Sequence, residues 1–156
     1  MNIIRLSIIL IVISISGCAH ILQPNLTITM EGCTDRIALS IIDETIDKSY
    51  KDISIMVASP VDANTLKAGN FGLAMQKLLI GAMAKKDIDV VDIGTKGADT
   101  LLVSTYIARK NDVVMTSKLV DLKTNDVIAF VTTTLYKSAC VDDLLNNQKG
   151  VRLYEN

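Results

Sequence analysis

The stretch that decides the fold reads DTLLVSTYIA (99–108), RKN (109–111), DVVMTSKLVDL (112–122), KTN (123–125) and DVIAFVTTTLY (126–136). Its long segments are rich in Val, Ile, Leu and Thr, which favour strands, and short polar links separate them. Links of this length join neighbouring strands as hairpins, so the stretch predicts an antiparallel meander. In the middle strand two alternating sets of side chains differ in polarity, which predicts one apolar face and one mixed face.

Upstream of the meander, segments whose apolar residues recur with the period of a helix alternate with segments that are typical of a strand. The predicted elements are a helix from an N-cap at Thr34-Asp35 to about Ser49, a strand over Asp52–Ala58, a loop over Val61–Ala68, a helix over Gly69–Lys86 and a strand over Asp87–Ile93. Gly81 lies inside the second helix, and we expect another element to approach it closely. The order α-β-α-β-β-β-β predicts one α+β domain, with two helices packed on one face of a mixed sheet that ends in the antiparallel meander.

The N-terminus reads MNIIRLSIILIVISISGC over residues 1–18. A cation at Arg5, an apolar run to Ile15 and small residues before Cys18 follow the order of a secretory signal peptide. The ending resembles the lipobox of bacterial lipoproteins, in which cleavage between Gly17 and Cys18 leaves the Cys as the lipidated first residue. The alternative is an uncleaved anchor helix, but a spanning helix needs about 20 apolar residues and this run is shorter.

Lipidation at Cys18 divides the chain into a signal peptide (1–17), a lipid-anchored tether (18–33), the α+β domain (34–140) and a polar C-terminal tail (141–156) that opens with a short helix over Val141–Leu145. Several acyl chains make an effectively permanent anchor. Ala19 follows the lipidated Cys, and in the lipoproteins that this chain resembles such a residue favours sorting to the outer membrane. The tether reaches at most about 50 Å when extended.

The remaining cysteines are Cys33 and Cys140. In an oxidising envelope two leftover cysteines favour a disulfide, and closing a loop of about 107 residues stabilises a fold by about 4–5 kcal/mol in the chain-entropy model. The alternative is two separate thiols. His20 is the single His of the chain, and we interpret it as a tether residue. Cys/His metal sites come in close-spaced clusters, which this sequence lacks, so no metal site is predicted.

The charges nearly cancel, with 16 Lys+Arg against 17 Asp+Glu, and no basic block stands out. Nucleic acid is therefore excluded as an expected partner. A catalytic triad would need a His in the folded part, and a phosphate-binding loop would need a Lys after the glycines of Gly69–Gly72. No Ser-x-x-Lys motif is present either. The sequence predicts no catalytic residue and no cofactor.

Acidic residues form two clusters, Asp87, Asp89 and Asp92 around one expected strand and Asp142-Asp143 near the C-terminus. Paired carboxylates can hydrolyse glycosides. Strand ends and turns, however, collect Asp because its side chain hydrogen-bonds the nearby backbone. Aromatic residues are 4% of the chain, which leaves no platform for a sugar. The chain is therefore interpreted as a non-enzymatic binding or scaffolding domain.

The stretch from Ile37 to Tyr136 resembles the domain of FlgO-type flagellar outer-membrane lipoproteins. After an opening helix, the segments that carry the resemblance are IMVASPVD (55–62), FGLAMQKLL (71–79), IDVVD (88–92), LVSTY (102–106) and VVMTSKLVDLKTNDVIA (113–129). Relatives have a further helix where this chain has only the short link Gly94–Ala98. The module is similar in type to the small domain at the start of TolB and in the curli secretion lipoprotein. The resemblance implies binding to other envelope proteins.

The resemblance also implies a function. The chain would be a periplasm-facing outer-membrane lipoprotein that acts as a scaffold or assembly factor for the flagellum or its outer-membrane ring, with basal-body components or further copies of itself as partners. The alternative is a regulatory lipoprotein that docks onto a cell-wall synthase or another envelope complex, as other lipoproteins with related small modules do. An edge strand gives a physical route to such contacts. We expect that edge to be the last strand, Asp126–Tyr136, or the first, Asp52–Ala58.

Overall fold

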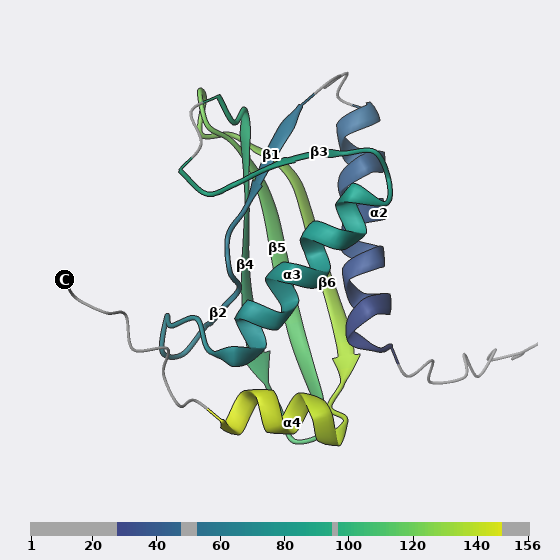
Figure 1. Ribbon diagram of the computed structural model, residues 1–156, viewed down its shortest axis with the longest axis vertical. Coiled ribbons are helices and arrows are strands. Elements are labelled where there is room, and N and C mark those ends of the chain that lie inside the picture. Colours follow the sequence, from purple (N-terminus) through teal and green to yellow (C-terminus); the bar gives the residue numbers. More distant parts are fainter. Residues whose placement is uncertain (1–27, 48–52, 95–96, 148–156) are drawn as a thin grey trace, which may run out of the picture.

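The computed structural model describes residues 28–47, 53–94 and 97–147. The elements along the chain are α2 (Met30–Asp47), β1 (Ser54–Val57), β2 (Val61–Asp62), α3 (Asn70–Ala84), β3 (Asp89–Val91), β4 (Thr100–Ala108), β5 (Asp112–Asp121), β6 (Val127–Tyr136) and α4 (Ala139–Asn146). The predicted α+β class and the order of the main elements are confirmed (Figure 1).

The strands form one mixed sheet in the order β3-β1-β4-β5-β6. β1 lies between β3 and β4 and is parallel to both, whereas β4, β5 and β6 are the antiparallel meander that the sequence predicted. The short β2 was expected to be loop; it pairs in parallel with the end of β4, beyond the point where β1 stops. Two residues after Pro60 are too few to show a strand period, so the sequence carried no signal for β2.

Helix α2 begins earlier than expected. Its first residue is Met30, and the N-cap predicted at Thr34 is wrong. The hydroxyl oxygen of Thr29 accepts a hydrogen bond from the Gly32 amide at 3.1 Å, which satisfies one of the free donors of the first turn. Thr34 is buried inside the helix and donates to the Glu31 carbonyl at 2.9 Å. The folded unit therefore includes part of the stretch assigned to the tether.

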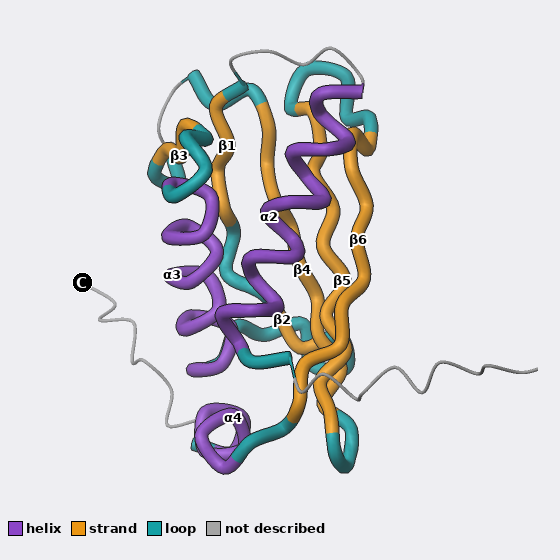
Figure 2. Tube along the Cα trace, turned by 90° about the vertical axis from the view of Figure 1, so that its right-hand side faces the viewer, coloured by secondary structure: helices purple, strands orange, loops and turns teal. Residues whose placement is uncertain are grey.

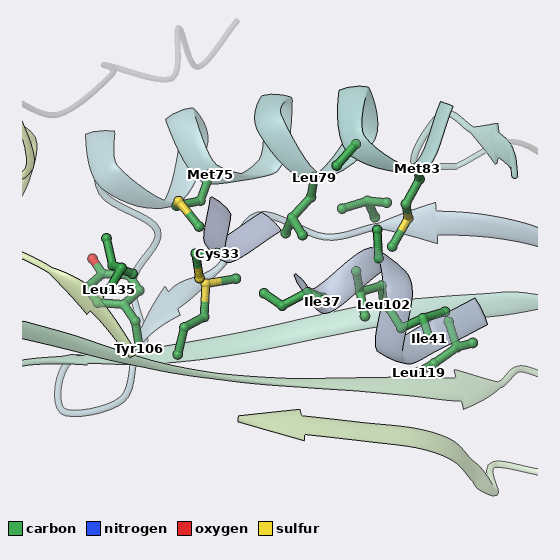
Figure 3. Close-up of a cluster of buried hydrophobic side chains, with 14 of the residues drawn as sticks. Cys33, Ile37, Ile41, Met75, Leu79, Met83, Leu102, Tyr106, Leu119 and Leu135 are labelled. Carbon is green, nitrogen blue, oxygen red and sulfur yellow. The ribbon is translucent and has the colours of Figure 1, made fainter. Parts of the chain in front are cut away.

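The two long helices cover one face of the sheet. In Figure 2, α2 crosses in front of the strands towards β6, and α3 lies on the side of β1 and β3. The core between these layers is almost wholly aliphatic and sulfur-containing, and Figure 3 shows its centre. The residues labelled there come from α2 (Cys33, Ile37, Ile41), α3 (Met75, Leu79, Met83), β4 (Leu102, Tyr106), β5 (Leu119) and β6 (Leu135).

Contacts at the start of α3 fix this helix against the strands. The Phe71 ring meets the Tyr106 ring edge-on, with centroids 4.7 Å apart. One amide group adds polar contacts: Gln76 Nε2 donates to the Val57 carbonyl at 2.8 Å, and its Oε1 accepts from Ser59 Oγ at 2.6 Å. The end of β1 is thereby tied to α3.

The close approach expected at Gly81 is found instead at Gly72. A Cβ on Gly72 would lie 2.0 Å from the Pro60 carbonyl oxygen, whereas a Cβ on Gly81 would meet nothing within 4 Å. The expectation about Gly81 is therefore wrong. Gly72 is the position at which only a glycine lets α3 pass the chain between β1 and β2.

Helix α4 follows the meander and packs on α3 at one end of the molecule (Figure 1). The sequence predicted a short helix over Val141–Leu145, and this helix is confirmed with longer bounds. Ser138 caps it, because its hydroxyl oxygen accepts from the Val141 amide. Val141 is buried, so the first part of the expected tail belongs to the folded unit.

Candidate partner-binding face

The face of the sheet opposite α2 and α3 is the open face. On β4, β5 and β6 the side chains alternate between the covered core and this face, as the period of a strand requires. None of the side chains of β4, β5 and β6 that point to the open face is buried. Its cross-strand rows, from one end to the other, are Leu101–Val120–Val127, Val103–Lys118–Phe130, Thr105–Thr116–Thr132 and Ile107–Val114–Thr134.

Large apolar side chains on or beside this face are strongly exposed. The exposed fractions are 57% for Phe130, 53% for Tyr136, 50% for Val127 and 44% for Ile107. Lys118 is the cation among them, and its Nζ lies 5.8 Å from the centroid of the Phe130 ring. Aromatic side chains are enriched at the centres of protein–protein contacts, whereas Lys is depleted there, so the exposed aromatic and aliphatic side chains suit the centre of such a contact and Lys118 suits its rim. The alternation of side chains in the middle strand, now β5, predicted one mixed face. In the structure this mixed face of β5 is part of the open face.

Among the described strands, β3 and β6 lie at the two ends of the sheet order, and the short β2 pairs with β4 alone. The expectation that the last strand is an edge is confirmed. The expectation that the first strand, Asp52–Ala58, is an edge is wrong, because β1 has β3 on one side and β4 on the other. A short strand placed after a helix can return to either side of β1, and the local sequence does not choose between them.

The two described cysteines are free in the structure. Cys33 is buried, and its Sγ lies 2.9 Å from Oγ1 of Thr133 in a hydrogen bond between α2 and β6. Burial raises the pKa of the Cys33 thiol, with the Thr133 hydrogen bond and Arg36 acting in the opposite direction. Cys140 is exposed at the start of α4. The predicted bridge between Cys33 and Cys140 is not formed here.

The acidic clusters noted in the sequence lie apart. Asp89 begins β3, and Asp87 and Asp92 flank it. β3 lies at the opposite end of the molecule from α4, which carries Asp142 and Asp143 (Figure 1). Asp142 forms an ion pair with Lys137, whose Nζ lies 2.8 Å away. Within the described ranges no group of three or more His, Cys, Asp or Glu side chains could hold a metal ion. The two acidic clusters are therefore not brought together into one site.

Several predictions concern residues outside the described ranges. They are the signal peptide, the cleavage between Gly17 and Cys18, the lipid on Cys18, the tether residue His20 and the end of the C-terminal tail. Of the helices that the structure does describe, none combines the length and the apolar character needed to cross a membrane.

The fold has known counterparts. No protein-family model matches the sequence, and no curated relative was found. The LpoB C-terminal domain from Escherichia coli is similar with a TM-score of 0.55 at 14% identity, over 68% of this chain and 97% of that one. The same domain from Salmonella enterica has a TM-score of 0.51 at 14% identity, with the same coverage of 68% and 97%. Lipoprotein GNA1162 from Neisseria meningitidis has a TM-score of 0.45 at 14% identity, over 56% and 82%. At this identity the likeness to LpoB shows the fold alone.

Proposed function

We propose that this chain is a lipid-anchored envelope protein without enzymatic activity, and that its α+β domain docks onto another envelope protein through the open face. Cys18 carries the lipid, after cleavage behind Gly17, and the membrane that it enters is the outer membrane. The lipobox-like ending of the N-terminal segment and Ala19 support this placement.

The observation that carries the proposal is the contrast between the two faces of the sheet. One face is closed by α2 and α3, whereas the other keeps Phe130, Tyr136 and Val127 half exposed or more. Exposed apolar patches of this kind mark protein-binding surfaces in soluble domains. A partner that covers the Lys118–Phe130 row would remove the exposed apolar side chains from water. The ammonium group of Lys118 would stay at the rim of the contact.

Two cellular roles suit such a domain. One is a regulator that docks onto a cell-wall synthase or another envelope complex, and the likeness to LpoB C-terminal domains favours this role. The other is a scaffold for the flagellum or its outer-membrane ring, which is supported by the FlgO-type resemblance of residues 37–136. We adopt the first role. The fold comparison and the open face both support a domain that docks onto another protein, and neither observation points to a flagellum.

The reach of the anchor limits where the partner lies. Ile28 is tied to the domain, since its carbonyl accepts the Tyr136 amide at 3.0 Å. Only residues 19–27 therefore separate the lipidated Cys18 from the folded unit, and they span at most about 30 Å. The docking part of the partner is then expected close to the membrane that holds the lipid.

Purification of the tagged full-length chain from membranes tests the role. We expect a cell-wall synthase or another envelope complex to co-purify, and a Phe130→Ser variant to lose it. Deleting the gene is expected to change cell-wall synthesis while swimming and flagellar number stay normal. Loss of swimming with normal wall synthesis would favour the flagellar scaffold instead. A chain that retains its partner after Phe130→Ser would contradict docking through the open face.

A further inference from the structure

A groove runs along the free edge of the sheet, between β6 and α2. It is separate from the open face, because α2 covers the other side of the sheet (Figure 2). Its strand wall is residues 131–134, and its helix wall is formed by Arg36, Leu39, Ser40 and Asp43. Ile28 also lines the groove, and its carbonyl accepts the Tyr136 amide at 3.0 Å. The described chain therefore begins beside the edge of β6, at one end of this groove.

The strand wall offers backbone groups to a further strand. The Tyr136 amide points away from β5, since it donates to the Ile28 carbonyl. Backbone groups alternate sides along a strand, so the amides and carbonyls of Thr132 and Thr134 point the same way as the Tyr136 amide. β6 pairs only with β5 among the described strands. Thr132 and Thr134 therefore present their donors and acceptors to whatever lies along this edge.

The sequence that leads to Ile28 has the pattern of a half-buried strand. It reads PNLTI over residues 24–28. The apolar Pro24, Leu26 and Ile28 alternate with the polar Asn25 and Thr27, which is the period of a strand with one covered face. Ile28 packs against the core on the helix side of the sheet. In a strand that ends at Ile28, the side chains of Leu26 and Pro24 point to the same side, which is the groove.

We propose that residues 24–28 form an edge strand parallel to β6 and fill the groove under α2. The bond from the Tyr136 amide to the Ile28 carbonyl sets the register, because in a parallel pair it places Ile28 opposite Leu135. Leu26 then lies opposite Thr133. Leu135 and Thr133 are buried on the helix side, so the apolar residues of the added strand continue the layer that α2 covers.

The register also pairs the backbone groups of the edge. The Leu26 amide donates to the Thr132 carbonyl, and the Leu26 carbonyl accepts the Thr134 amide. The Pro24 carbonyl accepts the Thr132 amide. Pro24 has no amide hydrogen to donate, and it stands at the first position of the strand, where a proline is tolerated. The proline therefore marks where the pairing begins.

The direction of the added strand agrees with the topology of the sheet. β6 is parallel to β4 and therefore to β1, because β5 runs antiparallel to both of its neighbours. The added strand leads through α2 to β1, just as β1 leads through α3 to β3. Both connections cross the same face and move the same way along the strand order. They therefore have the same hand, as parallel connections in one sheet do.

A strand from another protein suits the groove less well. Ile28 holds the edge at Tyr136, so a foreign strand would have to stop short of it. Residues 24–27 are joined covalently to Ile28, so their pairing does not cost the translational and rotational freedom of a second molecule. Their apolar side chains also give cover to Leu39 in the helix wall, which is 48% exposed.

The added strand changes where the anchor leaves the domain, a consequence that rests on the proposed function. With the lipid on Cys18, only residues 19–23 remain as a spacer, and they span at most about 17 Å. They leave the edge towards the start of β6, which is the end of the molecule opposite α4 (Figure 1). That end of the domain, with the β5–β6 turn, then faces the membrane.

Alkylation of introduced cysteines in membranes tests the strand with the full-length chain. In a Cys140→Ser background, Asn25→Cys, Leu26→Cys and Thr27→Cys are each treated with a maleimide, and mass spectrometry reads the labelling rate at the new cysteine. Leu26→Cys is expected to react at least about fivefold more slowly than either neighbour, because only its side chain points into the groove. A smaller difference, or the reverse order, would overturn the proposal.

Hydrogen exchange tests the register. In the full-length chain in detergent, the Thr134 amide is expected to be protected by the Leu26 carbonyl. Leu26→Pro removes an amide that faces β6, whereas the matched Thr27→Pro removes one that faces solvent. Exchange at Thr134 is expected to rise at least about tenfold in Leu26→Pro and to stay near the parent rate in Thr27→Pro.

Three results would overturn the register: an unprotected Thr134 amide in the parent chain, protection that persists in Leu26→Pro, or an equal loss in both proline variants. Persistent protection would show that a different segment or another protein covers the edge. Neither alkylation nor exchange involves the open face or its partner. Failure of the strand therefore leaves docking through the open face standing, and failure of docking leaves the strand standing.

Discussion

The Nζ of Lys118 lies 5.8 Å from the centroid of the Phe130 ring, across the β5–β6 pair on the open face. Both side chains are exposed. A cation over an exposed ring contributes about 0.5–1 kcal/mol, so the pair adds little to the stability of the fold. Its importance lies in the surface that it presents, because no described helix covers it (Figure 2).

Replacing Phe130 should therefore separate binding from stability. Phe130→Ser is expected to lower the free energy of unfolding by about 1 kcal/mol or less, because the ring is 57% exposed. Phe71→Ala, at a buried ring in contact with Tyr106, is the matched contrast and is expected to cost about 3–5 kcal/mol. Urea unfolding measures both. Equal losses in the two variants would show that Phe130 is part of the core.

Two glycines of α3 should respond in opposite directions to alanine. Gly72→Ala forces a Cβ to 2.0 Å from a backbone oxygen, which should cost about 1–3 kcal/mol. Gly81→Ala meets nothing within 4 Å and removes a helix-disfavouring residue, so stability should rise by about 0.5–1 kcal/mol. Thermal unfolding of both variants checks the pair. A stabilising Gly72→Ala would mean that α3 does not pass Pro60 this closely.

The two described cysteines should differ in reactivity. Cys140 is exposed and is expected to be alkylated in the native chain, whereas Cys33 is buried, with its pKa raised by that burial, and should react only after unfolding. Mass spectrometry after alkylation without reductant reads out both sites. If neither cysteine is labelled in the unfolded chain until reductant is added, the two are paired, and the disulfide expected from the sequence exists.

Alkaline pH should destabilise the fold through Tyr106. Burial, and to a smaller degree the charge of Asp62, raises the pKa of its phenol above the ordinary value. The folded state therefore holds this proton more tightly than the unfolded chain does. The resulting stability is present below about pH 10 and is lost as the pH rises further.

Tyr106→Phe tests this dependence. Urea unfolding at pH 8 and pH 11 is expected to show a smaller alkaline loss for Tyr106→Phe than for the parent chain. Part of the loss should remain, because the raised pKa of Cys33 acts in the same direction. An alkaline loss that is identical in both chains would contradict the assignment to Tyr106.

The sequence predicted those parts of the structure that local patterns determine. The meander follows from alternation and short polar links, and α3 follows from a wide apolar stripe, so both were found with nearly their observed bounds. The start of α2 was missed because the N-cap was placed at Thr34-Asp35 and the residues before it were assigned to the tether. The observed cap, Thr29, had a signal of its own, since Glu31 follows it in the first turn.

Non-local relations were beyond the sequence. That β1 lies inside the sheet, that β2 pairs with β4, and that Gly72 rather than Gly81 meets another segment all depend on packing between distant residues. The candidate site was predicted in part. The mixed face of the middle strand was visible in the alternation, but the apolar surface around Phe130 and the groove beside α2 became clear only once the helices were placed.

Photo-cross-linking in living cells tests the central claim most directly. A photoreactive phenylalanine analogue replaces Phe130 on the open face or, as a control, Lys77 on the exposed side of α3. Docking through the open face predicts a cross-link from position 130 to an envelope protein, identified by mass spectrometry, and none from position 77. A cross-link from position 77 with none from position 130 would contradict it.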